Sequence, residues 1–416
     1  MGQNRDMSRR LFLGAMLLAG YQLADPKVQA AASEDLGSWQ QGEGGNSAAK
    51  RQWVDSVNRL VELPLEIKTV VPTGVYGQAV LAAMDPSLIA SLAKPLIGLQ
   101  GLFLEEQLVD LPITGRLYSA SASAFDVDRV KAIAPDLVLD FGEYKETTLE
   151  DMNELQDILG IPVVHINSDQ LHLFKAIETL GNLLGTKKAT ELSEFAHDAL
   201  LYARSCAAEV DDSSKYRICI ANGERGALSH GTNTLENEVI ENAGALNCVE
   251  GVTYRRSATL TTELLESWNP DVVFMASRQC YEDYSSSPYA TSITWEALSA
   301  HFGDRIIPGK YSASLWFEDM TILDKQIIGS LYLGKILHPD IYNIDLEDVL
   351  AKYVELCFGA DMPTAYSAEA DDLPLIASRD EIKDQNKELE ERNNQIMEEF
   401  KRFQEERREA RLRGEE

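Results

Sequence analysis

The sequence predicts an α/β protein made of two Rossmann-like lobes with mainly parallel sheets, joined by one long connecting helix and followed by a charged C-terminal helix. Three observations predict this fold class. Strand-like and helix-like segments alternate along the chain, which is typical of parallel sheets. One helix–strand module occurs in each half. A helical pattern with few breakers separates the halves.

The repeated module is Asp128–Leu139 in its first copy and Glu263–Phe274 in its second. In each copy an acid stands seven residues before a Pro-Asp pair. Apolar residues at helical spacing come first, and the proline ends the helix. The run after Pro-Asp is short, apolar and rich in β-branched residues, as expected for a strand buried on both faces of a sheet. Two copies predict two similar lobes with a ligand cleft between them.

The first lobe is predicted over residues 51–167. Its strands are expected at 67–71, 137–140 and 161–166, and its helices at 78–84 and 149–159. Residues 168–210 form the predicted connecting helix, which Gly181 and Gly185 have the potential to divide in two. The second lobe is predicted over residues 211–360. It begins with a strand at 216–221, continues with a helix at 235–243, and closes with helices at 323–336 and 346–358.

The two ends of the chain differ from this pattern. Residues 1–32 resemble a twin-arginine signal peptide, because Arg9-Arg10 precedes an apolar stretch too short to span a bilayer. An ordinary secretory signal and a short membrane anchor are the alternatives. Residues 33–50 are predicted to be a flexible linker. Residues 361–416 are an acidic linker and a charged helix, either a weak coiled coil or a solvated helix.

Composition excludes one class of partner but does not decide whether any of the cysteines form a disulfide. The net charge of −29 argues against nucleic acid, because a phosphate backbone would be repelled. No cysteine stands in zinc-site spacing. Either one pair, with Cys219 and Cys248 as the candidate, forms a disulfide in an oxidising compartment, or all are buried apolar thiols. The five cysteines are Cys206, Cys219, Cys248, Cys280 and Cys357.

No motif indicates catalysis. The chain lacks GxSxG and HExxH, and Gly181–Lys188 has the wrong spacing for a phosphate loop. We therefore predict a protein that is not an enzyme and has no resident cofactor or metal.

The candidate ligand site consists of the loops that follow the strands, because ligands bind beyond the carboxyl ends of parallel strands. These loops collect arginines and aromatic residues in an otherwise acidic chain, which favours an anionic ligand held against flat walls. Each residue alone is equally well explained as a surface ion pair or a core aromatic. The candidate ligand-binding residues are Tyr76, Arg116, Tyr144, Arg225, His230, Arg255, Arg278 and Trp316.

Asp128 and Glu263 occupy equivalent positions near the starts of their helices. An acid there suits the helix dipole, which explains either one alone. A matching carboxylate on each lobe also suits a basic partner that straddles both lobes.

Several stretches of residues 50–360 resemble the substrate-binding proteins of ABC importers for iron–siderophores, haem and cobalamin. The resemblance rests on Trp53–Pro64, Asp85-Pro86, Pro135-Asp136, Glu241–Asn247 and Trp316-Phe317. It implies two lobes on one long helix with limited hinge motion, a metal chelate between them, and docking of Asp128 and Glu263 on the importer permease. Residue 128 is an aspartate where the family has a glutamate, and its shorter side chain reaches less far toward the permease.

The predicted function is therefore an exported, periplasmic and monomeric binding protein. It would capture a ferric siderophore or related chelate and deliver it to an ABC importer, touching the membrane only through the permease. Binding of haem or a corrinoid is the alternative within the family. A chelate-modifying enzyme, or an interaction protein that uses the charged tail, are alternatives outside it.

Overall fold

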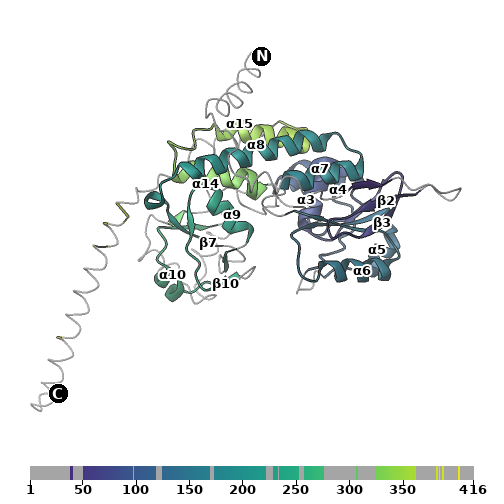
Figure 1. The fold of residues 1–416 in the computed structure, drawn as a ribbon, viewed down its shortest axis with the longest axis horizontal. Coiled ribbons are helices and arrows are strands. Elements are labelled where there is room, and N and C mark those ends of the chain that lie inside the picture. The colour runs from purple at the N-terminus through teal and green to yellow at the C-terminus, as the bar shows by residue number, and fades with distance from the viewer. Residues whose placement is uncertain are drawn as a thin grey trace, which may run out of the picture.

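The computed structural model describes most of the chain between residues 38 and 361. The described residues are 38–40, 50–96, 98–118, 124–168, 173–221, 228–232, 234–252, 257–275, 306–307 and 324–361, with five further positions in the C-terminal segment. Within them two lobes lie side by side beneath a layer of helices (Figure 1). The predicted α/β fold class is confirmed.

The first lobe is built on the parallel sheet β4-β5-β6. Its strands are β4 (Val70–Pro72), β5 (Leu137–Gly142) and β6 (Val163–Asn167), each nearly continuous in buried residues. Its helices are α3 (Val75–Met84), the 3-10 turn η1 (Pro86–Leu88), α4 (Gly98–Leu108), α5 (Val127–Ile133) and α6 (Thr148–Leu159). Helix α3 starts three residues earlier than the sequence predicted.

An antiparallel sheet of order β1-β2-β3 precedes this unit. Its strands are β1 (Ser38–Gln40), β2 (Lys50–Val54) and β3 (Leu60–Pro64). Strand β1 falls within residues 33–50, which the composition predicted to be a flexible linker. The structure differs there because these three residues pair with β2, with Trp39 opposite Trp53.

The second lobe is built on the parallel sheet β12-β11-β7-β9. Its strands are β7 (Arg217–Ala221), β9 (Leu246–Asn247), β11 (Val272–Met275) and β12 (Ile306–Ile307). A separate antiparallel pair, β8 (Leu228–His230) with β10 (Ser257–Thr259), and helices α9 (Leu235–Asn242) and α10 (Thr262–Trp268) complete the described part. Because β5 and β11 lie in different sheets, the two module copies belong to different lobes.

The two copies of the module share their helix geometry. The N-cap side chains Asp126 and Thr261 accept hydrogen bonds from the backbone N–H of the residue three positions on. Each helix ends one residue before Pro-Asp in the left-handed region, at Ala134 (φ 51°) and Asn269 (φ 41°). The helix break before each strand is therefore the same local structure in both lobes.

The aspartate of each Pro-Asp pair ties its strand to the neighbouring one. Asp136 Oδ2 accepts hydrogen bonds from the backbone N–H groups of Lys68 and Thr69, at 2.8 and 2.9 Å. Asp271 Oδ2 accepts one from the N–H of Arg217, at the start of β7, at 2.8 Å. These bonds fix the parallel register at the amino end of each sheet and explain why an aspartate follows the proline in both copies.

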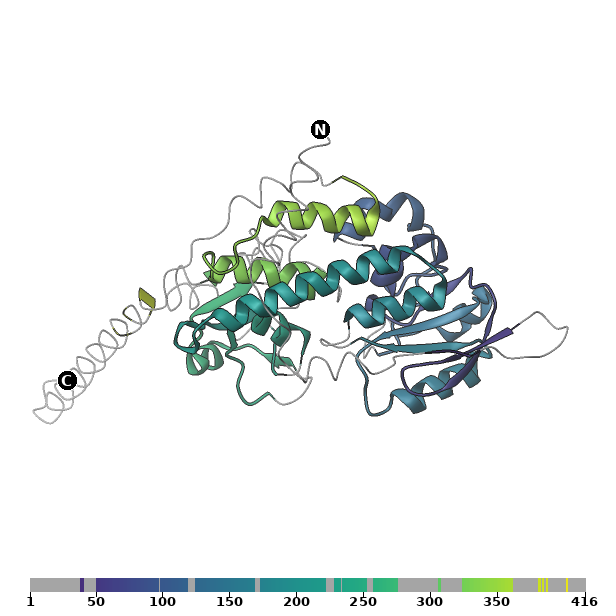
Figure 2. The same ribbon diagram turned by 45° about the horizontal axis from the view of Figure 1, so that its top comes forward.

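The predicted connecting segment comprises two helices, α7 (Leu173–Leu184) and α8 (Lys188–Glu209), and they break at Gly185, which has a φ of 74°. Helix α8 packs on α3 of the first lobe and on α9 of the second. Figure 2 shows α8 running across both lobes. The remaining described helical segments are η2 (Asp212–Ser214), the π-helical turn η5 (Asp324–Gly329), α14 (Ser330–Leu337) and α15 (Leu346–Phe358).

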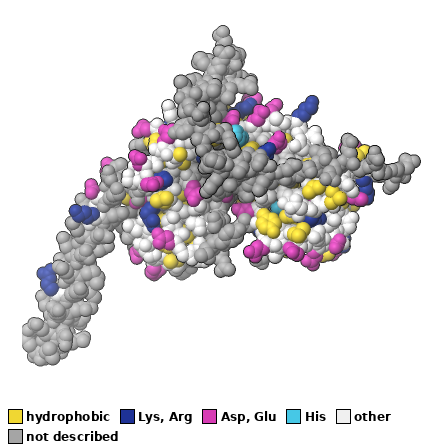
Figure 3. Space-filling view, in the orientation of Figure 1, with side chains coloured by type: hydrophobic (Ala, Val, Ile, Leu, Met, Phe, Trp, Pro, Cys, Tyr) yellow, Lys and Arg dark blue, Asp and Glu magenta, His cyan; other side chains and the backbone are white. Residues whose placement is uncertain are grey.

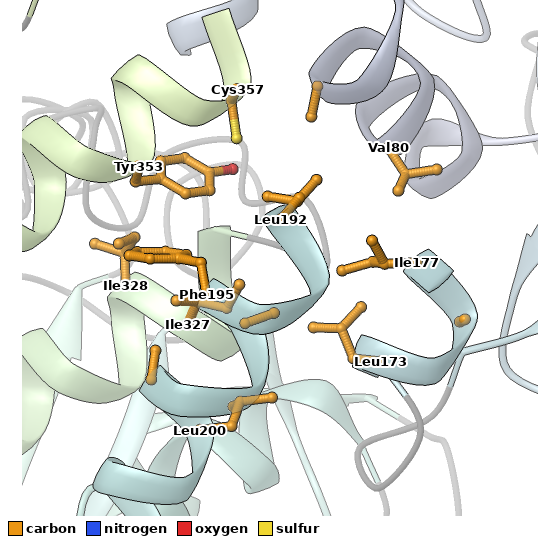
Figure 4. Close-up of a cluster of buried hydrophobic side chains, with 14 of the residues drawn as sticks. Val80, Leu173, Ile177, Leu192, Phe195, Leu200, Ile327, Ile328, Tyr353 and Cys357 are labelled. Atoms are coloured by element: carbon orange, nitrogen blue, oxygen red, sulfur yellow. The ribbon is translucent and has the colours of Figure 1, made fainter. Parts of the chain in front are cut away.

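One continuous apolar core joins the lobes. Buried side chains of both parallel sheets, such as Leu139 and Phe274, belong to the same cluster, which continues through α7, α8, α14 and α15. At the junction Leu192 of α8 lies between Ile177 and Tyr353 (Figure 4). Moving one lobe against the other would disturb this shared packing, so the core favours limited hinge motion.

Candidate functional site

A polar row crosses the first sheet where its strands end. Asp140 is paired in register with His165, and Thr73 directly follows the last residue of β4. The Nδ1 atom of His165 lies 2.7 Å from Oδ2 of Asp140, and the hydroxyl of Thr73 donates to Oδ1 of Asp140. All three residues are buried, with His165 fully inaccessible. The row therefore forms a fixed polar base under the carboxyl ends of the strands.

Electrostatics favour an ionised carboxylate in this row. Burial alone would raise the pKa of Asp140, but hydrogen bonds from His165 and Thr73, with the charge of Lys145, bring it below its ordinary value. The order is hydroxyl–carboxylate–imidazole, with the carboxylate in the middle. In a hydrolytic triad the imidazole is in the middle and activates the hydroxyl. The row therefore supplies structure and charge rather than a nucleophile.

A second layer of residues covers this base. The hydroxyl of Tyr118 donates to Oδ2 of Asp151 at 2.9 Å, and the Nζ atom of Lys145 lies 3.2 Å from the centre of the Tyr118 ring. Burial, with the nearby carboxylates of Asp140 and Asp151, raises the pKa of Tyr118, so its phenol stays neutral. In this layer the ammonium group of Lys145 is therefore stacked over one face of the Tyr118 ring.

Three predicted site residues also lie at the carboxyl end of this sheet, and together with Tyr118 and Lys145 they form what we call the rim of the first lobe. Tyr76 is the second residue of α3, and a Cβ on Gly142, at the end of β5, would lie 3.6 Å from its ring. The loop of Arg116 is held beside the start of α3 by a 2.8 Å hydrogen bond from the N–H of Leu117 to the carbonyl of Thr73.

Tyr144, the third of these residues, follows β5. It is 47% exposed, and its N–H donates to Oδ1 of Asn167 at 3.0 Å. The structure therefore brings Tyr76, Arg116 and Tyr144 to the carboxyl end of one sheet.

The second lobe is described for one predicted ligand-binding residue. His230 ends β8, its carbonyl accepts a 2.9 Å hydrogen bond from Nδ2 of Asn247, and its side chain is half-buried. It pairs with Ser257 of β10. The predicted residues Arg225, Arg255, Arg278 and Trp316 lie outside the described residues.

Asp128 and Glu263 occupy matching positions, as the second residue of α5 and of α10, and both are exposed. The backbone N–H of Glu263 itself and the hydroxyl of Thr261 lower the pKa of Glu263, so it is ionised at neutral pH. Helices α5 and α10 lie on the same side of the molecule, opposite α8 and α15 (Figure 1). Acidic side chains are exposed along that side of both lobes (Figure 3). The two carboxylates thus present one charge per lobe to the same side.

The sequence did not single out Lys145, Thr73, Asp140 or His165 as site residues. One signal was available, since Asp140 and His165 are polar residues within runs otherwise typical of fully buried strands. Pairing them required the register between β5 and β6, which the sequence does not state. Lys145 is assigned to the candidate site only because its ammonium group contacts the ring of Tyr118.

In the part of the chain that the structure describes, no three histidine, cysteine or acidic side chains come together in a way that would hold a metal ion. Within the same residues, every helix is either too short or too polar to cross a membrane.

Comparison with known proteins places this geometry in a family. A model of the periplasmic binding protein family matches residues 120–298. These residues are a periplasmic binding protein domain. The predicted resemblance is therefore confirmed, and the family is one of extracytoplasmic substrate-binding proteins of ABC importers rather than of enzymes. No curated protein sequence matches the chain.

Solved structures share the fold of about three quarters of this chain. An ABC transporter solute-binding protein from Sulfurospirillum deleyianum is 17% identical, with a TM-score of 0.63, and the match covers 76% of this chain and 97% of that one. The periplasmic binding protein MolA of Haemophilus influenzae, bound to molybdate, is 17% identical with a TM-score of 0.58, covering 75% and 99%. CeuE of Helicobacter pylori, in a nickel–histidine complex, is 15% identical with a TM-score of 0.55, covering 78% and 98%. These likenesses show the two-lobed fold.

Proposed function

We propose that this periplasmic binding protein captures an anionic metal chelate of the ferric-siderophore class between its lobes and delivers it to the permease of an ABC importer. The observation that carries the proposal is the rim of the first lobe. In a chain with a net charge of −29, this rim gathers Arg116 and Lys145 among three tyrosines. Cations concentrated in one place on an acidic protein favour an anionic ligand.

The chemistry of these residues suits such a ligand. A guanidinium fork pairs well with the paired oxygens of carboxylates and catecholates, and a neighbouring ammonium adds a point charge. Tyr76, Tyr118 and Tyr144 would provide flat, partly apolar surfaces for the organic part of the chelate. The carboxylate of Asp140 is hydrogen-bonded by Thr73 and His165 in the layer below.

The start of α3 lies at the same rim. Its N-cap, Gly74, has no side chain to cap the first turn, and nothing lies within 4 Å of the position that a Cβ would take there. The positive end of a ten-residue helix therefore adds to the field that would favour an anion.

Two structural neighbours support a metal-containing or oxyanionic ligand. CeuE is solved in a nickel–histidine complex and MolA with molybdate. Both ligands are small and carry a metal centre, which is the class that the rim of this protein suits.

Haem or a corrinoid is the second candidate. His230 on the second lobe and Tyr76 on the first are residue types that ligate haem iron in other proteins. A flat macrocycle would use the aromatic faces of the rim more than its cations. We further propose export by the twin-arginine route, docking of Asp128 and Glu263 on permease arginines, and roles in the second lobe for Arg225, Arg255, Arg278 and Trp316.

Titration calorimetry of the ligand-free protein tests the proposal. The ligands are a ferric catecholate, a ferric hydroxamate, haem, cobalamin and molybdate, with tryptophan fluorescence as a second readout. We expect micromolar or tighter binding of at least one ferric siderophore. Binding of haem or cobalamin alone would replace the ligand assignment. Native mass spectrometry of protein purified from its own host would identify a co-purified chelate.

A further inference from the structure

Two cysteines face each other inside the second lobe. The parallel register pairs Ile218 of β7 with Asn247 of β9, and the N–H of Cys248 continues the ladder with a 2.9 Å hydrogen bond to the carbonyl of Ile218. The next residues along the two strands are Cys219 and Cys248. They are therefore lateral neighbours at the edge of the sheet.

The two side chains also lie on the same face of the sheet. Both are fully buried, and both belong to one small apolar cluster with Leu265, Trp268 and Val273. The thiols are hydrogen-bonded to each other, and Sγ of Cys219 also lies 3.6 Å from Oγ of Ser229. Neighbouring strands lie about 4.8 Å apart, and disulfide-linked Cα atoms lie about 4.4–6.8 Å apart. A bond between the two sulfurs therefore needs little movement of the backbone.

We propose that Cys219 and Cys248 form a disulfide in the mature protein, which fastens β9 to β7. The proposal rests on the extracytoplasmic location given under the proposed function, because disulfides persist in oxidising compartments. Cys206 and Cys357 lie elsewhere, on α8 and α15. Sγ of Cys206 donates to the carbonyl of Ile341.

The chemistry balances with an external disulfide as oxidant. The thiolate of Cys219 attacks the oxidant and releases one thiol. The thiolate of Cys248 then displaces the second thiol from the mixed disulfide. The protein loses two electrons and two protons, and the oxidant gains both as it becomes two thiols.

Burial determines when this exchange takes place. Neither sulfur is accessible in the folded lobe, so the oxidant must act before β9 docks beside β7 or during local opening of this edge. Once formed, the disulfide is equally shielded from reductants. The disulfide would hold β7, the strand that contacts β8. Ser229 of β8 contacts Cys219 of β7 and donates a hydrogen bond to the carbonyl of Ile220.

Peptide mapping of the full chain tests the proposal. The protein is refolded in a glutathione redox buffer, alkylated in denaturant and digested with trypsin. The sequence places Cys219 alone in the peptide Ile218–Arg225 and Cys248 alone in Gly226–Arg255. We expect these two peptides to be linked and to separate on reduction. Two separately alkylated peptides, or a link from either one to a different cysteine, would overturn the proposal.

Thermal unfolding gives a second readout that does not depend on any ligand. The oxidised protein should melt roughly 5–10 °C higher than the reduced protein. Cys219→Ser and Cys248→Ser should remove the effect of reductant, and Cys206→Ser should keep it. If the serine variants do not fold, the wild-type comparison with and without reductant decides. The result of this experiment does not affect the ligand titrations, so the disulfide proposal and the ligand proposal can be refuted independently.

Discussion

The Nδ1 atom of His165 lies 2.7 Å from Oδ2 of Asp140, in a pair that is buried beneath the rim of the first lobe. The two residues come from adjacent parallel strands and stand directly opposite each other in register. The contact ties the ends of β5 and β6 together at the place where the proposed ligand would rest. The geometry of that rim therefore depends on a pair of buried residues in the layer below it.

Replacing Asp140 with asparagine should lower the free energy of unfolding by about 3 kcal/mol, because it leaves a buried hydrogen-bonding network without its charge. Denaturant titration at pH 7 measures the loss. Glu154→Gln, on the exposed face of α6, is the control and should change stability little. Equal stability of wild type and Asp140→Asn would show that the row contributes nothing.

The same variant should alter acid stability. Since the pKa of Asp140 is lower in the folded state than its ordinary value of 3.8, the folded state favours the ionised carboxylate. The contribution of the ionised Asp140 to the free energy of unfolding is complete above about pH 4 and is lost as the pH falls through the folded pKa. Asp140→Asn should therefore lose less stability than wild type below pH 4, as measured by denaturant titration at several pH values.

His338 predicts a pH dependence in a milder range. Burial lowers its pKa below 6.5, and its Nε2 atom lies 3.1 Å from the carbonyl of Gly244. The unfolded chain takes up a proton near pH 6.5 while the folded chain does not, so stability should fall as the pH drops below 6.5. His338→Asn should flatten the unfolding free energy between pH 7 and 5.

Replacing Arg116 with alanine should weaken binding of an anionic chelate about 10- to 100-fold, since a hydrogen bond to a charged group is worth about 1.5–3 kcal/mol. Arg116→Lys should retain part of the affinity, because it keeps the charge but loses the fork. Lys50→Ala removes an exposed cation from β2 and serves as the control. Calorimetry measures the affinities, and an unchanged affinity in Arg116→Ala would remove Arg116 from the site.

Alanine at both Asp128 and Glu263 should reduce transport without changing the affinity for the ligand. The measurement is stimulation of the permease ATPase by the loaded protein. Glu347 is also the second residue of its helix, α15, on the opposite side of the molecule (Figure 1). Glu347→Ala therefore removes an equivalent helix-start acid without affecting the proposed docking side. Transport at the wild-type rate in the double variant would exclude the docking role.

Leu192→Ala should cost about 2–5 kcal/mol, because it opens a cavity in the core that joins the lobes (Figure 4). We expect one cooperative unfolding transition at a lower denaturant concentration, since both lobes share that core. Leu65→Ala, at a side chain that is 59% exposed, is the control. Two separate transitions in the variant would show that the lobes are stabilised independently.

The structure of the repeated helix–strand module could be predicted from the sequence, because each of its features depends only on neighbouring residues. A helix stop at Pro135 or Pro270 and an apolar run afterwards need only neighbouring residues. The position of β5 and β11 in separate sheets followed from that repeat. The start of α3 at Val75 was missed because Gly74, Tyr76 and Gly77 read as a loop, although tertiary packing allows the helix to begin there.

Contacts between distant residues were beyond the sequence. The pairing of Asp140 with His165, and the position of Lys145 over Tyr118, depend on strand register and on the path of a loop. The hairpin of β2 and β3 was missed because its strands are short and half-exposed. For the candidate site, the sequence predicted Tyr76, Arg116 and Tyr144 on the rim but not the buried layer that supports them.

Helix α15 packs against α3, and the ring of Phe358 stacks on that of Phe103 with their centres 5.1 Å apart. The last helix of the binding domain thus covers a helix from its first lobe. A nascent chain that has left the ribosome only as far as α14 still lacks part of the cover for α3. Synthesis must therefore run almost to Gly359 before the first lobe is complete, and until then a chaperone would find apolar surface on it to hold.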